Sequence, residues 1–239
     1  MKYKAIVFDI DGTLIDYDYS QYLALSKLMN IIPWKSEQKP DDNAAFDIWF
    51  KEKFEVYKRP DSNEIGFYDQ QKIILENFLA YYGIISNSAK LSDQLIDNYK
   101  SSWRLYPDVM ECLLKYKDIP LHIISNGNSD FQRLKLTNTG IETYFVEILI
   151  SGDIGIKKPD SQIFTTMSER LNLEPQNLIY IGDRLDVDAV AANDAGMKGV
   201  WINRKRSADK KLMGSYSENN LPKNISEIYS LSHLDEIIK

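Results

Sequence analysis

Two carboxylates stand two residues apart near the start of the chain. The apolar run Ala5–Phe8 is followed by Asp9 and Asp11, and Gly12 then interrupts the pattern. A short β-branched and aromatic run closed by Gly is typical of a buried parallel strand, and open α/β sheets bind ligands at such strand ends. An isolated ionised Asp is costly to desolvate there, so the pair indicates a bound cation. The alternative is that both Asp residues only cap the following turn.

Three further polar clusters lie at or near the ends of other expected elements. They are Ser125-Asn126-Gly127, Lys157-Lys158-Pro159, and Gly182-Asp183 with Asp186 and Asp188 just beyond. Taken singly, each has an ordinary structural explanation as a turn, a surface charge or a helix cap. Independent caps need not converge on one edge of a sheet, so the shared placement favours one common site.

The residue types at these positions fit phosphoryl transfer. One carboxylate can attack phosphorus and form an aspartyl phosphate, while a second protonates the leaving oxygen and later accepts a proton from water. Mg²⁺ prefers oxygen ligands and is commonly held by one or two carboxylates plus substrate phosphate. A Ser hydroxyl and a Lys ammonium can bind the remaining phosphate oxygens. Each part is supplied once, by Asp9, Asp11, Ser125, Lys158 and Asp183.

Strand and helix patterns alternate in the first and third parts of the chain. We expect strands at Lys4–Asp9, Leu121–Ser125, Val146–Ile150, Leu178–Gly182 and Gly199–Ile202. Amphipathic stretches lie near Pro107–Tyr116, Ser129–Thr139, Asp160–Leu171 and Val187–Ala195. This alternation predicts an α/β fold, a Rossmann-like parallel sheet with helices on both faces. The chain end is expected to form a last helix with a capping box at Ser232 and Asp235.

The segment between Tyr17 and Arg104 shows helical patterns instead of strands. The patterns lie near Tyr19–Ile32, Asp42–Tyr57, Tyr68–Tyr82 and Ser88–Trp103. We therefore expect a core domain made of residues 1–16 and 105–239, and an inserted four-helix cap domain at residues 17–104. An insertion directly after the first strand is placed to cover the carboxylates.

The composition is that of a soluble globular protein. The 239 residues are 44% hydrophobic and 27% charged, and the net charge of −6 argues against a broad nucleic-acid-binding surface. The single cysteine, Cys112, excludes an intrachain disulfide and fits a reducing compartment. No apolar run reaches the roughly 18 residues of a membrane helix. We expect a cytoplasmic protein with a small phosphorylated metabolite as its partner, and neither a nucleic acid polymer nor a membrane.

At these residues the sequence resembles the haloacid dehalogenase-superfamily hydrolases, of the subgroup with a helical cap after the first motif. It is similar to capped phosphatases and 5′-nucleotidases along essentially the whole chain. The family motifs stand in order at Asp9–Thr13 (D-x-D-G-T), Ser125-Asn126, Lys158-Pro159 and Gly182–Asp188 (G-D-x-x-x-x-D). Four motifs in order and at expected strand ends make the resemblance specific.

The resemblance implies a role for each motif residue. Asp9 would be the nucleophile, and Asp11 the general acid/base with its backbone carbonyl on the metal. Lys158 would neutralise charge during catalysis, and Thr13 would support the nucleophile loop. The residues implied in binding the substrate phosphate are Thr13, Ser125, Asn126 and Lys158. The implied ligands of Mg²⁺ are Asp9, Asp11, Asp183 and Asp188.

Three assignments stay open or rest on a choice between neighbours. Asp188 matches the usual last acidic position, whereas Asp186 matches a shorter-spaced family variant, and Asp188 is favoured. Lys158 is preferred to Lys157 because the family lysine directly precedes the Pro. Arg184 stands where small polar residues are usual, and it either touches substrate or points outward.

Asp11 distinguishes a phosphatase or a phosphomutase from a dehalogenase. The 2-haloacid dehalogenases resemble this chain but lack the second Asp of the first motif, and phosphomutases retain it. Non-catalytic binding proteins on this fold usually lose a motif carboxylate, and none is missing here. We expect a Mg²⁺-dependent phosphatase of small phosphate monoesters that forms an aspartyl phosphate, with nucleoside monophosphates the first substrates to test.

More than half of the aromatic residues lie in the expected cap, including Trp34, Trp49 and Trp103. One interpretation is that some of them stack on a nucleobase. The other is that a four-helix domain uses aromatic rings to fill its own core, which stripes at helical spacing favour.

Overall fold

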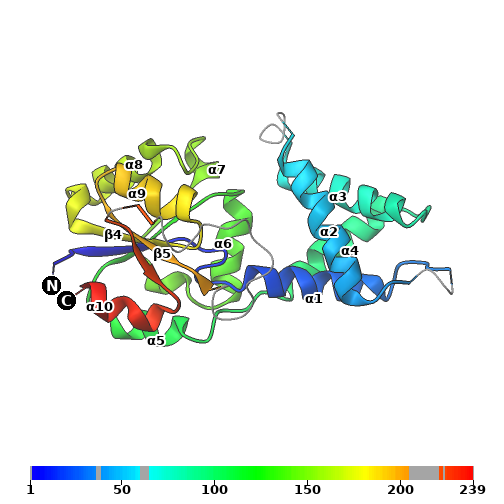
Figure 1. Cartoon of the computed structure of the whole chain (residues 1–239), viewed down its shortest axis with the longest axis horizontal. Helices are drawn as coiled ribbons and strands as arrows, with labels where there is room; N and C mark the ends of the chain where they lie inside the picture. The colour runs from blue at the N-terminus through cyan, green and yellow to red at the C-terminus, as the bar shows by residue number, and fades with distance from the viewer. Residues whose placement is uncertain (1, 36–38, 60–64, 205–220, 223, 239) are drawn as a thin grey trace. The chain divides into compact units, whose positions relative to one another are not determined.

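The structure is a computed structural model that describes residues 2–35, 39–59, 65–204, 221–222 and 224–238. The chain divides into two compact units (Figure 1). Met1–Asp16 and Arg104–Lys239 form an α/β unit, and Tyr17–Trp103 forms a helical unit.

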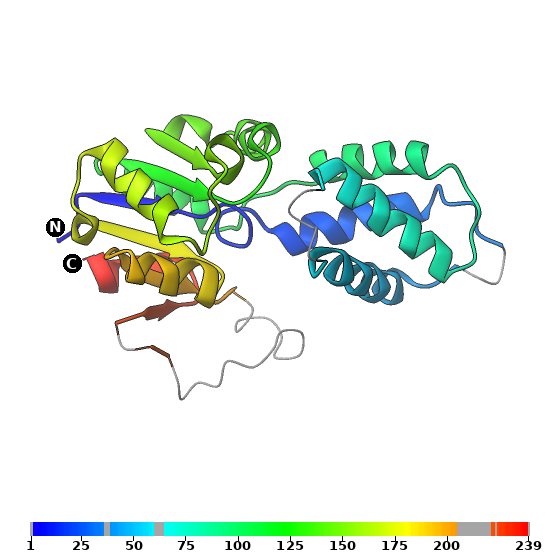
Figure 2. The same cartoon turned by 90° about the horizontal axis from the view of Figure 1, so that it is seen from above.

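The described part of the α/β unit contains a six-stranded sheet in which every neighbouring pair is parallel. The strand order is β3-β2-β1-β4-β5-β6, so β1 lies in the middle, between β2 and β4 (Figure 2). Strands are added to one side of β1 and then to the other, and such a reversal is where α/β sheets bind ligands. The strands are β1 (Ala5–Phe8), β2 (Leu121–Ser125), β3 (Glu147–Ile150), β4 (Leu178–Gly182), β5 (Lys198–Ile202) and β6 (Ser226–Ile228).

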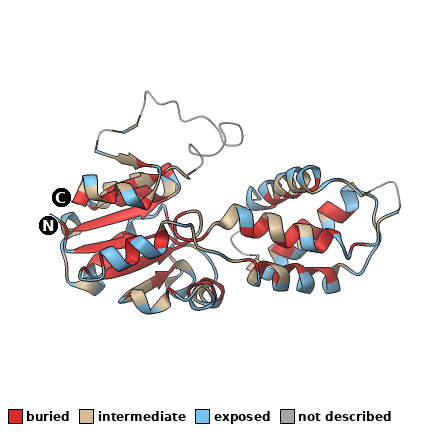
Figure 3. Cartoon of the chain, turned by 90° about the horizontal axis from the view of Figure 1, so that it is seen from below, coloured by how far each residue is buried: buried red, intermediate tan, exposed pale blue. Residues whose placement is uncertain are grey.

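Helices cover both faces of this sheet. Ile6 and Phe8 of β1 pack into the core shared with α5, α6 and α10, whereas Ala5 and Val7 pack into the core shared with α8 and α9. This alternation follows from the two-residue period of a strand, and Figure 3 shows the strands largely buried between the helices. The predicted α/β fold class with a Rossmann-like parallel sheet is therefore confirmed. The α-helices are α5 (Val109–Lys115), α6 (Ser129–Asn138), α7 (Ser151–Ile154), α8 (Ser161–Leu171), α9 (Ala191–Asp194) and α10 (Asp235–Ile238). There are also 3₁₀-helical turns η1 (Glu142–Tyr144), η2 (Pro175–Asn177) and η5 (Leu231–Leu234), and a π-helical turn η3 (Leu185–Val190).

The helical unit contains four helices within its described residues. They are α1 (Tyr17–Met29), α2 (Asp42–Tyr57), α3 (Phe67–Tyr81) and α4 (Ser88–Lys100). Some of its aromatic rings pack in the interior: Trp49 and Phe78 are buried and meet edge-on at 5.7 Å, whereas Trp34 and Tyr82, which meet at 5.3 Å, are half-buried. The Trp49–Phe78 pair supports the interpretation of aromatic residues as core packing.

The chain leaves and re-enters the α/β unit at adjacent residues. The Asp16 N–H donates to the Arg104 carbonyl at 3.0 Å, and the Tyr106 N–H donates to the Leu14 carbonyl at 3.0 Å. The Arg104 guanidinium also pairs with the Asp16 carboxylate at 2.6 Å. The α/β unit thus closes on itself at the point where the helical unit is inserted.

Across the described ranges of both units, no helix combines the length and the apolar character needed to cross a membrane.

Candidate active site

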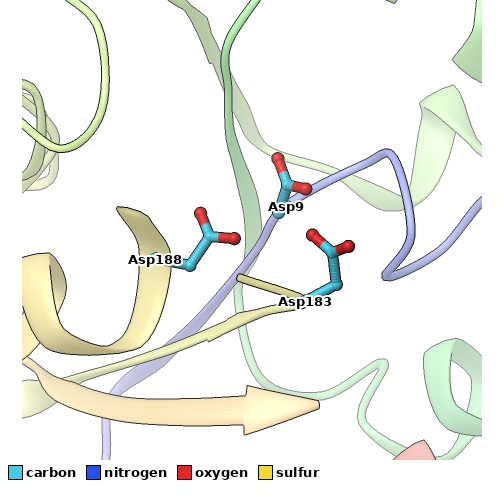
Figure 4. Close-up of side chains that lie close together, drawn as sticks. All are labelled: Asp9, Asp183 and Asp188. Carbon is cyan, nitrogen blue, oxygen red and sulfur yellow. The ribbon is translucent and has the colours of Figure 1, made fainter. Parts of the chain in front are cut away.

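Three carboxylates meet at the carboxyl edge of the sheet. Asp9 follows β1, Asp183 follows β4, and Asp188 lies in the π-helical turn η3. Because β1 and β4 pair with Phe8 opposite Ile181, the residues just beyond them reach the same edge. One ligand oxygen from each residue lies within 4.8 Å of the others, and Figure 4 shows the three side chains pointing toward one another. Such a set of oxygen donors could hold a metal ion.

Two glycines let the backbone approach these carboxylates closely. Gly12 has φ +78°, and a Cβ atom there would lie 2.2 Å from Asp183 Oδ2. A Cβ atom on Gly182 would lie 2.4 Å from the Cβ of Asp188. Both motif glycines are therefore required by the space around the carboxylates, and Gly12 also by its backbone conformation.

Lys158 is the cation of the cluster. Its Nζ lies 2.7 Å from Asp9 Oδ1 and 2.7 Å from Asp188 Oδ1, and the side chain is buried. Burial raises the pKa of Asp9 to about 6, with Lys158 opposing the shift and Asp188 adding to it. Burial also acts to lower the pKa of Lys158, but Asp188 and Asp9 outweigh it and the net shift is upward. Lys158 is thus held as an ammonium between two carboxylates.

Tyr180 of β4 adds a hydroxyl that the sequence did not single out. Its oxygen lies 2.8 Å from Lys158 Nζ, 3.1 Å from Asp188 Oδ1 and 3.1 Å from the Ile124 carbonyl. Burial raises the pKa of Tyr180, and the neighbouring Asp188 raises it further. The phenol therefore stays protonated and helps to orient Asp188 and Lys158, both of which it contacts.

Asn126 and Ser125 lie at the end of β2. The Asn126 side chain accepts from the Lys158 N–H at 2.8 Å and donates to the Lys158 carbonyl at 2.9 Å. These two bonds anchor the segment that carries Lys158. The Ser125 hydroxyl is buried and accepts from Gln132 Nε2 at 2.8 Å.

Asp11 and Thr13 lie in the loop after β1, and the Asp11 carboxylate is not one of the three that group together. The Asp11 carboxylate contacts Lys135 and Gln132 of α6. Thr13 is fully buried, and its hydroxyl has no hydrogen-bond partner among the described residues. Its carbonyl accepts from Arg204 at 2.6 Å and 3.0 Å. This placement fits a Thr13 that supports the loop better than one that touches a substrate phosphate.

The structure separates the residues that the sequence left as alternatives. Asp188 is buried in the cluster, whereas Asp186 is 56% exposed and lies 3.5 Å from Arg184, itself 62% exposed. Arg184 thus points outward. Lys158 is buried in the site, and Lys157 is exposed.

Three contacting residues were missed by sequence reasoning: Tyr180, Gln132 and Lys135. A signal existed for the two on α6, because they stand at i and i+3 just after the Ser125-Asn126-Gly127 cluster. Tyr180 gave no such signal, since a Tyr in a buried strand is ordinarily core.

Comparison with known proteins gives the same picture along most of the chain. The model of the haloacid dehalogenase-like hydrolase family matches residues 3–196. A glyceraldehyde 3-phosphate phosphatase of Methanopyrus kandleri is 30% identical over 218 residues, which cover 86% of each chain. The pyrimidine 5′-nucleotidase PynA of Streptococcus pneumoniae is 23% identical over 207 residues, which cover 85% of each chain.

Solved structures share the fold. The HAD-hydrolase YfnB of Bacillus subtilis, solved with bound magnesium, superposes with a TM-score of 0.77 at 22% identity and full coverage of both chains. Haloacid dehalogenases have the same fold as well, so the fold does not choose the reaction. The family match and the 30% identical relative do decide membership, and they confirm the predicted enzyme class of hydrolase. The chain belongs to the haloacid dehalogenase-like hydrolase family.

Proposed function

We propose that the protein is a Mg²⁺-dependent phosphatase that hydrolyses small phosphate monoesters through an aspartyl phosphate on Asp9. The observation that carries the proposal is the convergence of Asp9, Asp183 and Asp188, two of which contact Lys158, with Asp11 two residues from Asp9. Relatives named as a phosphatase and as a 5′-nucleotidase, which align over 86% and 85% of this chain, support the same reaction class.

The donor set fits Mg²⁺. Asp9, Asp183 and Asp188 offer only oxygen ligands, and three carboxylates beside one lysine leave the cluster with excess negative charge. We assign the metal to these three side chains, with the Asp11 carbonyl as the further ligand that the family resemblance implies. A bound Mg²⁺ supplies charge neutralisation to the phosphoryl oxygens.

The protein's own residues perform the bond changes. A carboxylate oxygen of Asp9 attacks phosphorus, and the bond from phosphorus to the leaving oxygen breaks while Asp11 donates a proton to that oxygen. Asp11 then takes a proton from a water molecule, whose oxygen attacks the aspartyl phosphate and releases inorganic phosphate and free Asp9. The Lys158 ammonium offsets the negative charge beside Asp9 in both steps.

Asp11 sets this proposal apart from a haloacid dehalogenase, and net release of phosphate sets it apart from the other two alternatives. A haloacid dehalogenase needs no proton donor at that position, whereas ester cleavage gives an alkoxide that must be protonated. A phosphomutase would keep both Asp residues and return the phosphoryl group to a second hydroxyl. A non-catalytic binding protein would turn over no substrate.

The substrate class is a small phosphate monoester, and two relatives point to two kinds. One is named for glyceraldehyde 3-phosphate and the other for pyrimidine nucleotides. We further propose that the helical unit acts as a cap that selects between them. Trp49 and Phe78 are committed to the core of this unit, which favours selection of the substrate by residues other than a stacked aromatic ring.

A substrate screen of the purified protein, with Mg²⁺ and with chelator, tests the proposal. The panel contains p-nitrophenyl phosphate, triose and hexose phosphates, pyrimidine and purine nucleoside monophosphates, and 2-chloropropionate. Release of phosphate from at least one ester with Mg²⁺, and none with chelator, is the expected result. Chloride release without phosphate release would contradict it. If sugar phosphates are hydrolysed far better than every nucleotide, nucleobase stacking is excluded.

A further inference from the structure

The Asp11 carboxylate is anchored by a helix that carries none of the family motifs. Lys135 Nζ lies 2.7 Å from Asp11 Oδ1 and 2.6 Å from Oδ2, and Gln132 Nε2 lies 3.1 Å from Oδ2. Lys135 and Gln132 are both buried, whereas 26% of the Asp11 side chain is exposed. The carboxylate is therefore fixed from its inner side and remains accessible from the other.

Lys135 and Gln132 restrain the Asp11 carboxylate in different ways. Lys135 reaches both carboxylate oxygens and so restricts rotation of the carboxylate plane. Gln132 reaches one of them, and its Nε2 also lies 2.8 Å from Ser125 Oγ and 3.1 Å from the Asn126 carbonyl. An amide nitrogen has two hydrogens, so these acceptors share them. Gln132 thus connects Asp11 to the end of β2.

The start of α6 sets the position of both side chains. Asn128 caps the helix by accepting from the Phe131 N–H at 3.0 Å, directly after the Ser125-Asn126-Gly127 cluster. A Cβ atom on Gly127 would lie 3.2 Å from Gln132 Cγ, so glycine leaves the space in which Gln132 lies. The start of α6 is therefore fixed relative to the end of β2, and this fixes the positions of Gln132 and Lys135.

We propose that Gln132 and Lys135 are positioning residues that hold the Asp11 carboxyl group in line with the leaving oxygen, to which its protonated form donates the proton. The inference rests on the proposed role of Asp11 as general acid/base. Proton transfer requires a short and directed contact, and a carboxylate on a loop reaches it only when its orientation is fixed.

The variants Lys135→Met and Gln132→Met test the inference. Each replaces a polar group by an unbranched apolar chain of similar length. Arg133→Met is the matched control, because Arg133 stands between them on α6, pairs with Asp153 at 2.9 Å and is 40% exposed. Melting temperatures identify any variant that does not fold. If one of the two test variants does not fold, the other is enough to test the inference.

The readout is kcat/KM for two esters that differ in their need for a proton. The p-nitrophenolate ion leaves without protonation, whereas an alkoxide does not. In each test variant we expect kcat/KM for an alkyl phosphate to fall by about 10- to 100-fold, and kcat/KM for p-nitrophenyl phosphate to change by less than about three-fold. Arg133→Met is expected to match the wild type for both esters.

Equal losses for the two esters, or no loss for either, would overturn the inference. Asp11→Asn separates this failure from that of the proposed function. If Asp11→Asn selectively lowers kcat/KM for the alkyl phosphate and neither test variant does, the proposed role of Asp11 stands and only the positioning role of Gln132 and Lys135 is wrong. If Asp11→Asn shows no dependence on the leaving group, the proposed role of Asp11 is wrong and the inference fails with it.

Discussion

At the scale of single residues, Lys158 explains why buried carboxylates can share one place. Its ammonium contacts both Asp9 and Asp188, and its pKa is raised because these two carboxylates outweigh the effect of burial. Asp9, Asp188 and Asp183 contribute three carboxylates, whereas Lys158 contributes one ammonium, so the cluster carries excess negative charge. The charge imbalance is the physical reason to expect a divalent cation at this site.

Asp188→Asn and Asp186→Asn form a matched pair, because both remove one carboxylate from η3. Asp188 is in the buried cluster and Asp186 is at the surface. We expect Asp188→Asn to lower Mg²⁺-dependent turnover by about 100-fold or more, and Asp186→Asn to stay within about two-fold of the wild type. Steady-state assays over a Mg²⁺ titration measure both. The reverse order of effects would show that the last metal ligand is misassigned.

His122 of β2 gives a prediction that is independent of catalysis. Burial lowers the pKa of His122 to about 4, and its Nδ1 has no hydrogen-bond partner in the described part of the chain. An unfolded His binds a proton near its ordinary pKa of about 6.5. Between that pH and about 4 only the unfolded state is protonated, so His122 contributes stability that is present above pH 6.5 and lost as the pH falls.

The measurement is urea unfolding of the wild type and His122→Leu at pH 7.5 and pH 4.5. We expect the wild type to lose more stability on acidification than the variant does. Equal losses in the two proteins would mean that His122 is not the group responsible.

At the scale of elements, the hydrophobic pattern predicted the strands that have a buried apolar run. The five expected strands are confirmed, two with the predicted ends and three with ends that differ by one residue. β6 was missed because Ser226–Ile228 has one apolar residue, Ile228, to signal burial. It pairs with β5 at the edge of the sheet, and such a contact between distant segments leaves no local pattern.

The expected last helix is present as α10, but its predicted cap is not. The expected capping box at Ser232 and Asp235 does not form, because Ser230 caps η5 through the Ser232 N–H. The Asp235 carboxylate instead accepts from the Tyr116 hydroxyl at 2.6 Å. A tertiary contact replaced the local one, which sequence spacing alone could not predict.

Gly12→Ala tests the loop after β1, with Gly140→Ala as its control. Both glycines have a left-handed backbone, at φ +78° and φ +73°, but an added Cβ meets Asp183 only at Gly12 and has open space at Gly140. Each variant should lose about 1 kcal/mol of stability from its backbone conformation. Gly12→Ala alone should also lose at least about 10-fold in kcat, because Asp183 must move. Denaturant unfolding and turnover assays separate the two effects, and unchanged turnover in Gly12→Ala would contradict this view of the loop.

At the scale of the whole molecule, parallel topology explains how much of the site could be predicted. Asp9 and Asp183 follow neighbouring parallel strands, and strands of one direction end at one edge. The strand pattern of the sequence is therefore sufficient to predict that these two side chains lie together. The contacts of Tyr180 depend on which face of the sheet its side chain occupies, and those of Gln132 and Lys135 depend on the rotation of α6 about its axis. Both are set by tertiary packing, which the sequence pattern does not show.

The central claim is that Asp9 is the nucleophile of a Mg²⁺-dependent phosphatase. Its most direct test is turnover of p-nitrophenyl phosphate with Mg²⁺ by the wild type and by Asp9→Asn, with circular dichroism to show that both are folded. Asparagine keeps the size of the side chain but cannot form the aspartyl phosphate. We predict that turnover in Asp9→Asn falls by at least about 1,000-fold. Turnover within about ten-fold of the wild type, in folded Asp9→Asn protein, would contradict the covalent mechanism.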